Sequence, residues 1–136
     1  MNDAARFAAA GAAAATVWAL LEPLDRRLFR YDYSDVAVLG KFVTRGPAWR
    51  PVGLMLHAAN GMAFGLAYRE AKSRRGWSAL RVAMVEHVAL YPLSAVVDRR
   101  HPARGSQGVP KLLTPRAFGQ ATLRHAVFGT LLGRLA

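Results

Sequence analysis

The sequence predicts an all-α integral membrane protein, a bundle of four transmembrane helices within a single domain, residues 1–136. Three observations lead to this prediction. Four apolar stretches of helical length recur along the chain. Most of the 19 basic residues lie between or at the ends of these stretches, where polytopic membrane proteins concentrate lysine and arginine. The hydrophobic fraction of 53% also exceeds that of average soluble domains.

The first apolar stretch is rich in alanine and forms the first predicted span, at about residues 5–24. A basic residue, Arg6, precedes an apolar run of a length that also fits a secretory signal peptide. No small-x-small cleavage site follows the run, which ends instead in Glu22 and Pro23. We therefore expect a membrane span rather than a cleaved signal.

A polar, basic segment from residue 26 to residue 50 contains a short predicted helix at 34–43. Ser34 or Asp35 can cap the free amides at its start. Val36, Leu39 and Val43 share one face of this helix. Its expected place is the headgroup layer between spans 1 and 2, and the alternative is a surface helix folded over the end of the bundle.

The second predicted span, residues 51–68, holds no formal charge and has a basic residue on each side. Eighteen helical residues cover about 27 Å, close to the hydrocarbon thickness of a bilayer. His57, Gly61 and Gly65 recur every four residues, with Asn60 beside them. One face of this helix is therefore small and polar, as in membrane helices that pack closely on their neighbours.

The third and fourth predicted spans cover residues 80–97 and 116–135. Pro92 is expected to kink the third span, because proline removes an amide donor and clashes with the preceding turn. The fourth is the least hydrophobic of the four. Between them, residues 101–115 predict an irregular connector with a solvated His101.

The two halves of the chain resemble each other. The motif His-x3-Gly-x3-Gly occurs at 57–65 and again at 125–133, each time about 34 residues after a Leu-x-Pro-Leu sequence. This pattern favours a parallel 2+2 internal duplication, although leucine and proline matches also arise by chance. In both motifs the glycines, Gly61, Gly65, Gly129 and Gly133, are expected to serve helix packing.

An up-and-down arrangement places most of the polar intramembrane residues at one end of the bundle. The predicted cluster comprises Glu22, Asp25, His57, Asn60, His87, Tyr91, Ser94, Asp98, Gln120, Arg124 and His125. Arg124 needs a carboxylate, because an unpaired charge in a membrane is costly. Its expected partner is Glu22 or Asp98.

Three functions fit this cluster. The groups can simply hold the helices together in a structural or accessory subunit. They can form an ion, proton or small-solute route, since ionisable groups inside membranes often mark one. As a third alternative, His57 and His125 can ligate haem or a metal from facing helices. No phosphate-binding loop, HExxH motif or nucleophile triad is present in the sequence, so enzymatic activity is not expected.

The net charge and the absence of cysteine limit the kinds of partner that the chain is expected to have. The net charge of +11 suits anionic lipid headgroups or nucleic acid. The basic run at 72–75 is too short for a nucleic-acid surface, so we expect lipids, further copies of the chain, or a larger membrane complex as partners. There is no cysteine, which excludes disulfides. The mean hydropathy is only modestly positive, which keeps a soluble basic helical domain as the alternative.

The Glu22-Pro-Leu-Asp sequence followed by the two His-x3-Gly-x3-Gly motifs resembles small uncharacterised four-helix membrane proteins of high-GC bacteria. The resemblance covers most of the chain and implies a four-helix fold in the bacterial cytoplasmic membrane, with no activity attached. Residues 26–50 and 98–116 carry eleven basic residues, and 69–81 carries five. This bias predicts that the longer loops face the cytoplasm.

Overall fold

The computed structural model describes residues 2–136, and this part of the chain is all-α, as the sequence predicts. The elements are α1 (Asp3–Phe29), α2 (Asp35–Val43), α3 (Trp49–Arg75), α4 (Ala79–Leu90), the 3-10 turn η1 (Tyr91–Leu93), α5 (Ser94–Arg100) and α6 (Pro115–Leu135). Residues 2–136 contain no strand, only an isolated bridge between Tyr33 and Gly108. The four predicted spans fall within α1, α3, the α4–α5 segment and α6.

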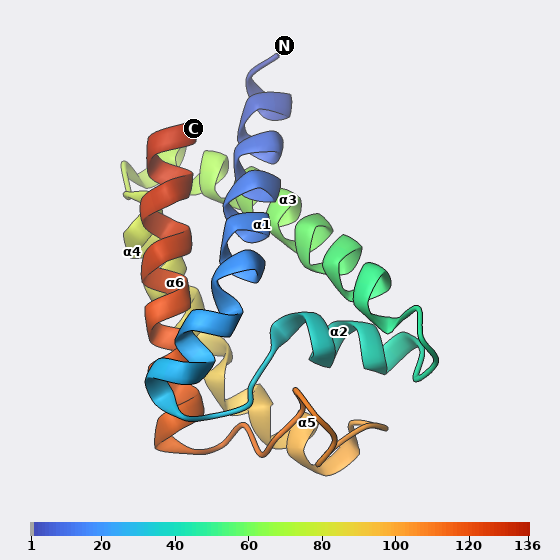
Figure 1. The fold of residues 1–136 in the computed structure, drawn as a ribbon. Coiled ribbons are helices and arrows are strands. Elements are labelled where there is room, and N and C mark those ends of the chain that lie inside the picture. Colours follow the sequence, from blue (N-terminus) through green and yellow to red (C-terminus); the bar gives the residue numbers. More distant parts are fainter. Residues whose placement is uncertain (1) are drawn as a thin grey trace.

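Helix α1 lies at the centre of the molecule. It contacts α3 on one side and α6 on another, while α4 packs on α6 and α2 on α3. Figure 1 shows α1, α4 and α6 side by side, with α3 crossing α1 obliquely. Both termini lie near the end where α3 meets α4, and α2 and α5 lie toward the other end. Because α3 leans away from α4, a gap remains for the cleft described below.

Small residues let the helices approach closely. A Cβ atom added to Gly61 would lie 2.5 Å from the Gly11 carbonyl oxygen, and one added to Gly65 would lie 2.1 Å from the Phe7 carbonyl oxygen. At Gly129 the nearest atom would be the Leu80 Cα at 2.7 Å. The glycine faces of α3 and α6 therefore pack against α1 and α4 of the same chain.

The core is correspondingly light in large side chains. Its buried members are Phe7, Ala10, Ala14, Ala15, Trp18, Tyr68, Ala79, Ala83, Phe128 and Leu132. Alanines at one face of α1 allow close backbone contact, and the aromatic rings fill the space that remains between the helices. Trp18 is a core aromatic residue that contacts His57 and His125 of the predicted polar cluster.

Local capping determines most helix ends. The side chain of Ser34 accepts a hydrogen bond from the Ala37 amide at the start of α2, so Ser34 and not Asp35 is the cap. Ser78 and Thr114 cap α4 and α6 in the same way. Gly76, with φ of 64°, ends α3 in the left-handed conformation that glycine adopts without strain.

Helix α1 continues beyond the predicted end of the first span. It includes Pro23 and ends at Phe29. Proline at this position removes one helical hydrogen bond, yet Glu22 and Asp25 on the same turns bind residues from α2 and α6. These tertiary contacts stabilise the last turns of α1 in the helical conformation. A local sequence pattern cannot predict them.

The predicted break at Pro92 is confirmed, since α4 gives way to the η1 turn before α5 begins. The connector 101–114 is irregular, also as predicted. The expectation of a solvated His101 is wrong, because this side chain is 3% exposed. Its Nε2 donates to the Val38 carbonyl at 2.8 Å and its Nδ1 accepts from the Ala103 amide at 3.0 Å. His101 thus fastens the connector to α2.

Two segments are long and apolar enough to cross a membrane, namely α1 and the stretch Ala79–Arg100. Helices α3 and α6 do not reach the same apolar content in residues 2–136. Histidine, asparagine and glycine lower the hydropathy of α3, and Gln120, Arg124 and His125 lower that of α6. The four-span bundle is therefore supported for two of its helices only.

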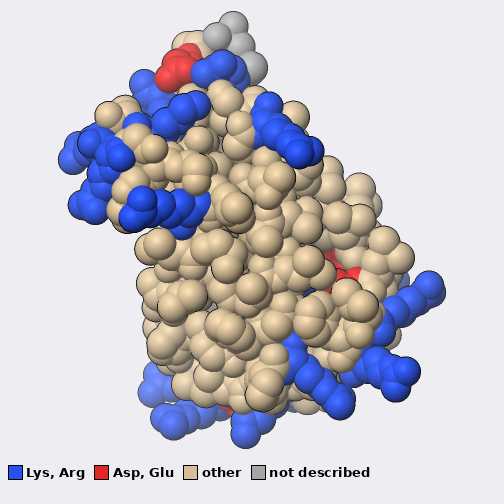
Figure 2. Space-filling model, turned by 90° about the vertical axis from the view of Figure 1, so that its left-hand side faces the viewer, with Lys and Arg blue, Asp and Glu red and all other residues tan. Residues whose placement is uncertain are grey.

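Charges are segregated on the surface. Figure 2 shows lysines and arginines toward two opposite ends, with a broad uncharged band between them that is interrupted by one small recessed acidic patch. Many large apolar side chains of α1, α3 and α4 are exposed, among them Leu20 at 71%, Met55 at 72% and Val88 at 59%. So many exposed large apolar side chains are unusual for a small soluble monomer.

Candidate functional site

Arg124 of α6 is the centre of a buried ionic cluster. Its Nε and Nη2 donate to the two carboxylate oxygens of Asp25 at 2.5 and 2.7 Å, and its Nη1 donates to Asp35 at 2.7 Å. Nη2 also donates to the Tyr33 carbonyl at 2.7 Å, and the guanidinium lies over the Tyr33 ring. The side chain of Arg124 is 2% exposed. Every nitrogen of the guanidinium group therefore has a partner.

Glu22, one of the two partners predicted for Arg124, forms an ion pair with it at 3.8 Å, a longer contact than those of Asp25 and Asp35. The Glu22 carboxylate also accepts hydrogen bonds from the Ser34 hydroxyl at 2.5 Å and from the Asp35 amide at 2.8 Å. Glu22 thus binds the amino-terminal end of α2, where the helix dipole favours a negative charge.

Asp98 is not a partner of Arg124, which corrects the second alternative. Its two carboxylate oxygens accept from the amides of Leu112 and Leu113 at 2.5 and 2.9 Å. Asp98 begins the last turn of α5, where it reaches the connector and not α6. This residue consequently stands apart from the rest of the predicted polar cluster.

Replacing Asp98 by alanine is expected to loosen the connector without unfolding the protein. Two charge-assisted hydrogen bonds are lost, together worth about 2–4 kcal/mol of local stability. Cleavage by trypsin after Arg104 and Lys111 should accelerate by at least tenfold, while helix content stays the same. A matched change at exposed Asp3, which caps no loop, should leave the cleavage rate at its original value.

Gln120 completes the cluster by donating from Nε2 to Asp25 at 2.7 Å. The carboxylates of Glu22, Asp25 and Asp35 surround the Arg124 guanidinium. Backbone amides at the start of α2 also donate hydrogen bonds to Glu22. Burial alone would raise the pKa of Asp35, but Arg124 and the Tyr33 hydroxyl outweigh it and hold the pKa below its usual value. Burial and the neighbouring Asp35 charge raise the pKa of the Tyr33 hydroxyl well above its usual value.

Two members of this cluster, Tyr33 and Asp35, were missed in the sequence analysis. The sequence analysis considered Asp35 only as a helix cap and gave Tyr33 no part in the cluster. Their contact with Arg124 depends on how the segment before α2 and the first turn of α2 fold back toward α6. No spacing along the chain specifies this return.

A second polar site adjoins the cluster. A half-open cleft of about 240 Å³ lies between α3 and α4, with α1 and α6 behind it and α2 beside it. Polar residues lining it are Tyr33, Asp35, His57, Asn60, Glu86, His87, Tyr91, Ser94 and His125. The structure thus divides the predicted cluster into an ionic part around Arg124 and a histidine-rich part in the cleft.

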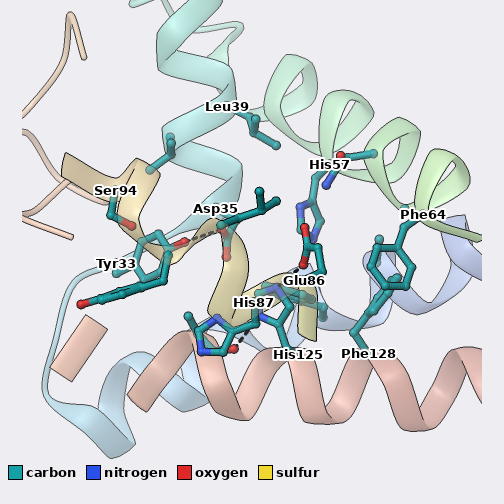
Figure 3. A pocket seen from close by; sticks show the side chains of 18 residues that line it. Tyr33, Asp35, Leu39, His57, Phe64, Glu86, His87, Ser94, His125 and Phe128 are labelled. Atoms are coloured by element: carbon teal, nitrogen blue, oxygen red, sulfur yellow. Dashed lines mark hydrogen bonds and ion pairs between the residues drawn. The ribbon is translucent and has the colours of Figure 1, made fainter. Parts of the chain in front are cut away.

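Aromatic contacts connect the histidines of the cleft (Figure 3). The ring of Trp18 meets the rings of His57 and His125 edge to face, with centroids 5.2 and 4.8 Å apart. His87 stacks on His125 at 4.6 Å, and its Nε2 lies 2.9 Å from the Thr122 hydroxyl. His57 and His125 therefore share a tryptophan neighbour, although they come from different helices.

The histidines were also considered as metal or haem ligands. In residues 2–136, no three side chains among histidine, aspartate and glutamate come together in an arrangement that could hold a metal ion. His125 instead contacts Glu86 at 3.1 Å through Nε2 and the Ala121 carbonyl at 2.7 Å through Nδ1. Glu86 is therefore a further ionisable residue of the site, one that the sequence analysis did not include.

The fold and the two sites define the class of the chain: an all-α protein with two helices long and apolar enough to cross a membrane, and with an internal ionic cluster next to a half-open polar cleft. Comparisons with protein-family models, curated proteins and solved structures returned no match for the chain. The resemblance to small bacterial membrane proteins therefore stays a prediction, and function has to be argued from the geometry.

Proposed function

We propose that the chain is an integral membrane protein with four helical spans that presents its polar cleft, sideways, to small molecules dissolved in the bilayer. The uncharged band between two basic ends carries this proposal (Figure 2). A bilayer matches that pattern in both regions: acyl chains cover the exposed apolar side chains, and anionic headgroups meet the basic ends. In water the same band would be a large apolar patch.

The bonding of the ionic cluster around Arg124 supports a structural role for this cluster within the proposed membrane protein. A charge inside a membrane protein is tolerated when its hydrogen-bonding capacity is satisfied. All three guanidinium nitrogens of Arg124 are bonded, and the partners come from α1, α2 and the segment before α2. A group bound so completely is suited to fastening helices and is poorly suited to passing ions along a path.

The glycine faces support the same view. Gly61 and Gly65 are used against α1, and Gly129 is used against α4, so these surfaces serve packing within the chain. These glycine faces are occupied within the chain, so association with further copies or with a larger complex, which stays a prediction, would use other surfaces. Similar contacts in the two halves, α3 on α1 and α6 on α4, also favour the internal duplication.

A transport role is the second candidate. The observation in its favour is the placement of Glu86 and His125 near the middle of their helices, where ionisable groups often mark a route. It predicts that His57→Leu or Glu86→Gln abolishes flux of protons or solute in liposomes while the fold stays intact. Binding without flux would favour the cleft as a site only.

Membrane integration can be tested with single cysteines, because the chain has none of its own. Ser73 and Ser106 are exposed and lie at the two basic ends, while Met55 lies in the apolar band. We expect Ser73→Cys to react with an impermeant maleimide on intact spheroplasts, and Ser106→Cys to react only after permeabilisation. Met55→Cys should be unreactive until detergent is added.

The same cells provide the control. The protein should stay with the membranes after a carbonate wash, which strips peripheral proteins. Equal labelling of all three cysteines, together with release by carbonate, would instead identify a soluble helical domain and overturn the proposal. Reaction of Ser106→Cys from outside would reverse the predicted orientation and leave the four spans intact.

A further inference from the structure

His57 is buried in the cleft with an unused hydrogen-bonding atom. Its side chain is 5% exposed, yet its Nε2 has no partner within residues 2–136. Figure 3 shows the imidazole pointing from α3 toward the region where Glu86 and His125 converge. A buried nitrogen left unpaired is unfavourable. A ligand oxygen in the cleft would relieve this cost, so His57 is the first anchoring group of a binding site.

The pair His125–Glu86 provides a second anchoring group that holds one proton. His125 Nδ1 faces a carbonyl oxygen and must donate to it, while Nε2 faces the Glu86 carboxylate. Both contacts are hydrogen bonds only if one proton lies between Nε2 and the carboxylate, on either atom. The pair is then neutral as a whole and offers further lone pairs to a ligand.

Aromatic rings form the apolar walls between these groups. The Phe64 and Phe128 rings meet edge to face at 5.0 Å, and the Phe128 ring also contacts Trp18. The volume of about 240 Å³ is larger than the roughly 150 Å³ in which an engineered protein cavity holds benzene. The cleft can therefore accept a substituted or fused planar ring between its aromatic walls.

Charge in the cleft favours a neutral ligand. Its lining within residues 2–136 includes no lysine or arginine, and the nearby Arg124 is fully occupied. Asp35 and Glu86 would repel an anion. The cleft opens between α3 and α4, next to exposed apolar residues such as Leu90 and Leu93, so entry is from the lipid side if the chain spans the membrane.

We propose that this cleft binds a neutral planar ring bearing two hydroxyl groups, the chemistry of a hydroquinone head group. One hydroxyl donates to His57 Nε2, and another donates to a lone pair of the His125–Glu86 pair. The ring itself lies against Trp18, Phe64 and Phe128. This inference rests on the proposed membrane location, since such rings are dissolved in the bilayer. It concerns binding alone and includes no electron transfer.

Trp18 gives a direct readout of binding. In a chain carrying Trp49→Phe and Trp77→Phe, Trp18 is the sole tryptophan, and it lines the cleft. We expect 1,4-dihydroxynaphthalene, kept reduced, to quench its fluorescence in lipid nanodiscs along a saturating curve. Naphthalene has the same fused ring without the hydroxyl groups, and should compete at least tenfold more weakly if two hydrogen bonds hold the diol.

Variants assign the binding to the named groups. His57→Leu should weaken dihydroxynaphthalene binding about tenfold, the loss expected for one hydrogen bond. Thr130→Val is the matched control, because the exposed Thr130 hydroxyl bonds only to a carbonyl of its own helix, α6. It should leave the binding curve unchanged. If His57→Leu fails to fold, the comparison of dihydroxynaphthalene with naphthalene on the unaltered histidine still decides the proposal.

Two results would overturn the inference. Quenching that rises linearly with the dihydroxynaphthalene concentration and never saturates reports collisions in the lipid. Equal competition by naphthalene shows an apolar cleft, suited to an acyl chain, in which neither His57 nor the His125–Glu86 pair binds the ligand. Failure of the protein to enter nanodiscs would appear before any titration, and would count against the membrane proposal instead.

Discussion

Replacing Arg124 by methionine is expected to lower the melting temperature by roughly 10–20 °C, because removing one partner of a buried ion pair costs about 3–5 kcal/mol. The methionine fills a similar volume but leaves Asp25 and Asp35 without a cation. The two carboxylates then repel each other inside the molecule, and α2 loses its attachment to α6. Thermal unfolding of the purified protein in detergent measures the effect.

The controls separate charge from packing. Arg134→Met alters the same residue type at the exposed end of the same helix and should change the melting temperature by less than about 2 °C. Arg124→Lys keeps the charge but cannot donate to both oxygens of Asp25 at once, so it should fall between the two. Adding Asp25→Asn and Asp35→Asn to Arg124→Met should recover part of the loss. An Arg124→Met protein as stable as the original would refute the fastening role.

Local features of the fold follow directly from the sequence. A serine before an apolar run predicts the start of α2, and Pro92 predicts the break between α4 and α5. These features depend on a few neighbouring residues, whose conformational preferences agree here with the tertiary structure. The end of α1 does not belong to this group, because contacts from α2 and α6 carry the helix past Pro23.

The candidate sites show a different limit. Helix direction alone placed Asp25, Gln120 and Arg124 at one end, and in the structure these residues are bonded together. Of the two partners predicted for Arg124, Glu22 does lie within ion-pair distance and Asp98 does not. The shorter contact with Asp35 was not predicted, because Asp35 comes from a segment outside the spans that folds back on the helices. The position of this segment depends on packing between helices, and the periodic patterns of the sequence do not predict that packing.

The oblique course of α3 is also a tertiary property. The sequence pattern placed His57 and Gly61 on one face but could not specify how steeply that face crosses α1. The angle decides whether α3 closes on α4 or leaves a cleft, and thus whether His57 is enclosed by protein or faces a ligand. The glycines at the crossing are consequently the residues on which both fold and cleft depend.

Gly61→Ala is expected to destabilise the protein by about 3 kcal/mol, the range seen for overpacked interiors, whereas Gly133→Ala should be neutral or stabilising by up to about 1 kcal/mol. Both glycines lie in helices, so alanine raises the helix propensity at each, although less at Gly133 in the last turn of α6. They differ in space: a Cβ at Gly61 would lie 2.5 Å from both the Gly11 oxygen and the Ala15 Cβ, but one at Gly133 would have no neighbour closer than 3.5 Å.

Comparing the thermal unfolding of the two variants therefore tests the close α1–α3 contact against a helical glycine that has room for a Cβ atom. Gly61→Ala must also push α3 away from α1, which separates His57 from Trp18 and admits solvent or lipid to the cleft. The emission of Trp18 should shift in Gly61→Ala and stay constant in Gly133→Ala. Equal stability and equal emission in the two variants would mean that α3 does not cross α1 at its glycines, and the cleft would lose the geometry that places His57 at its wall.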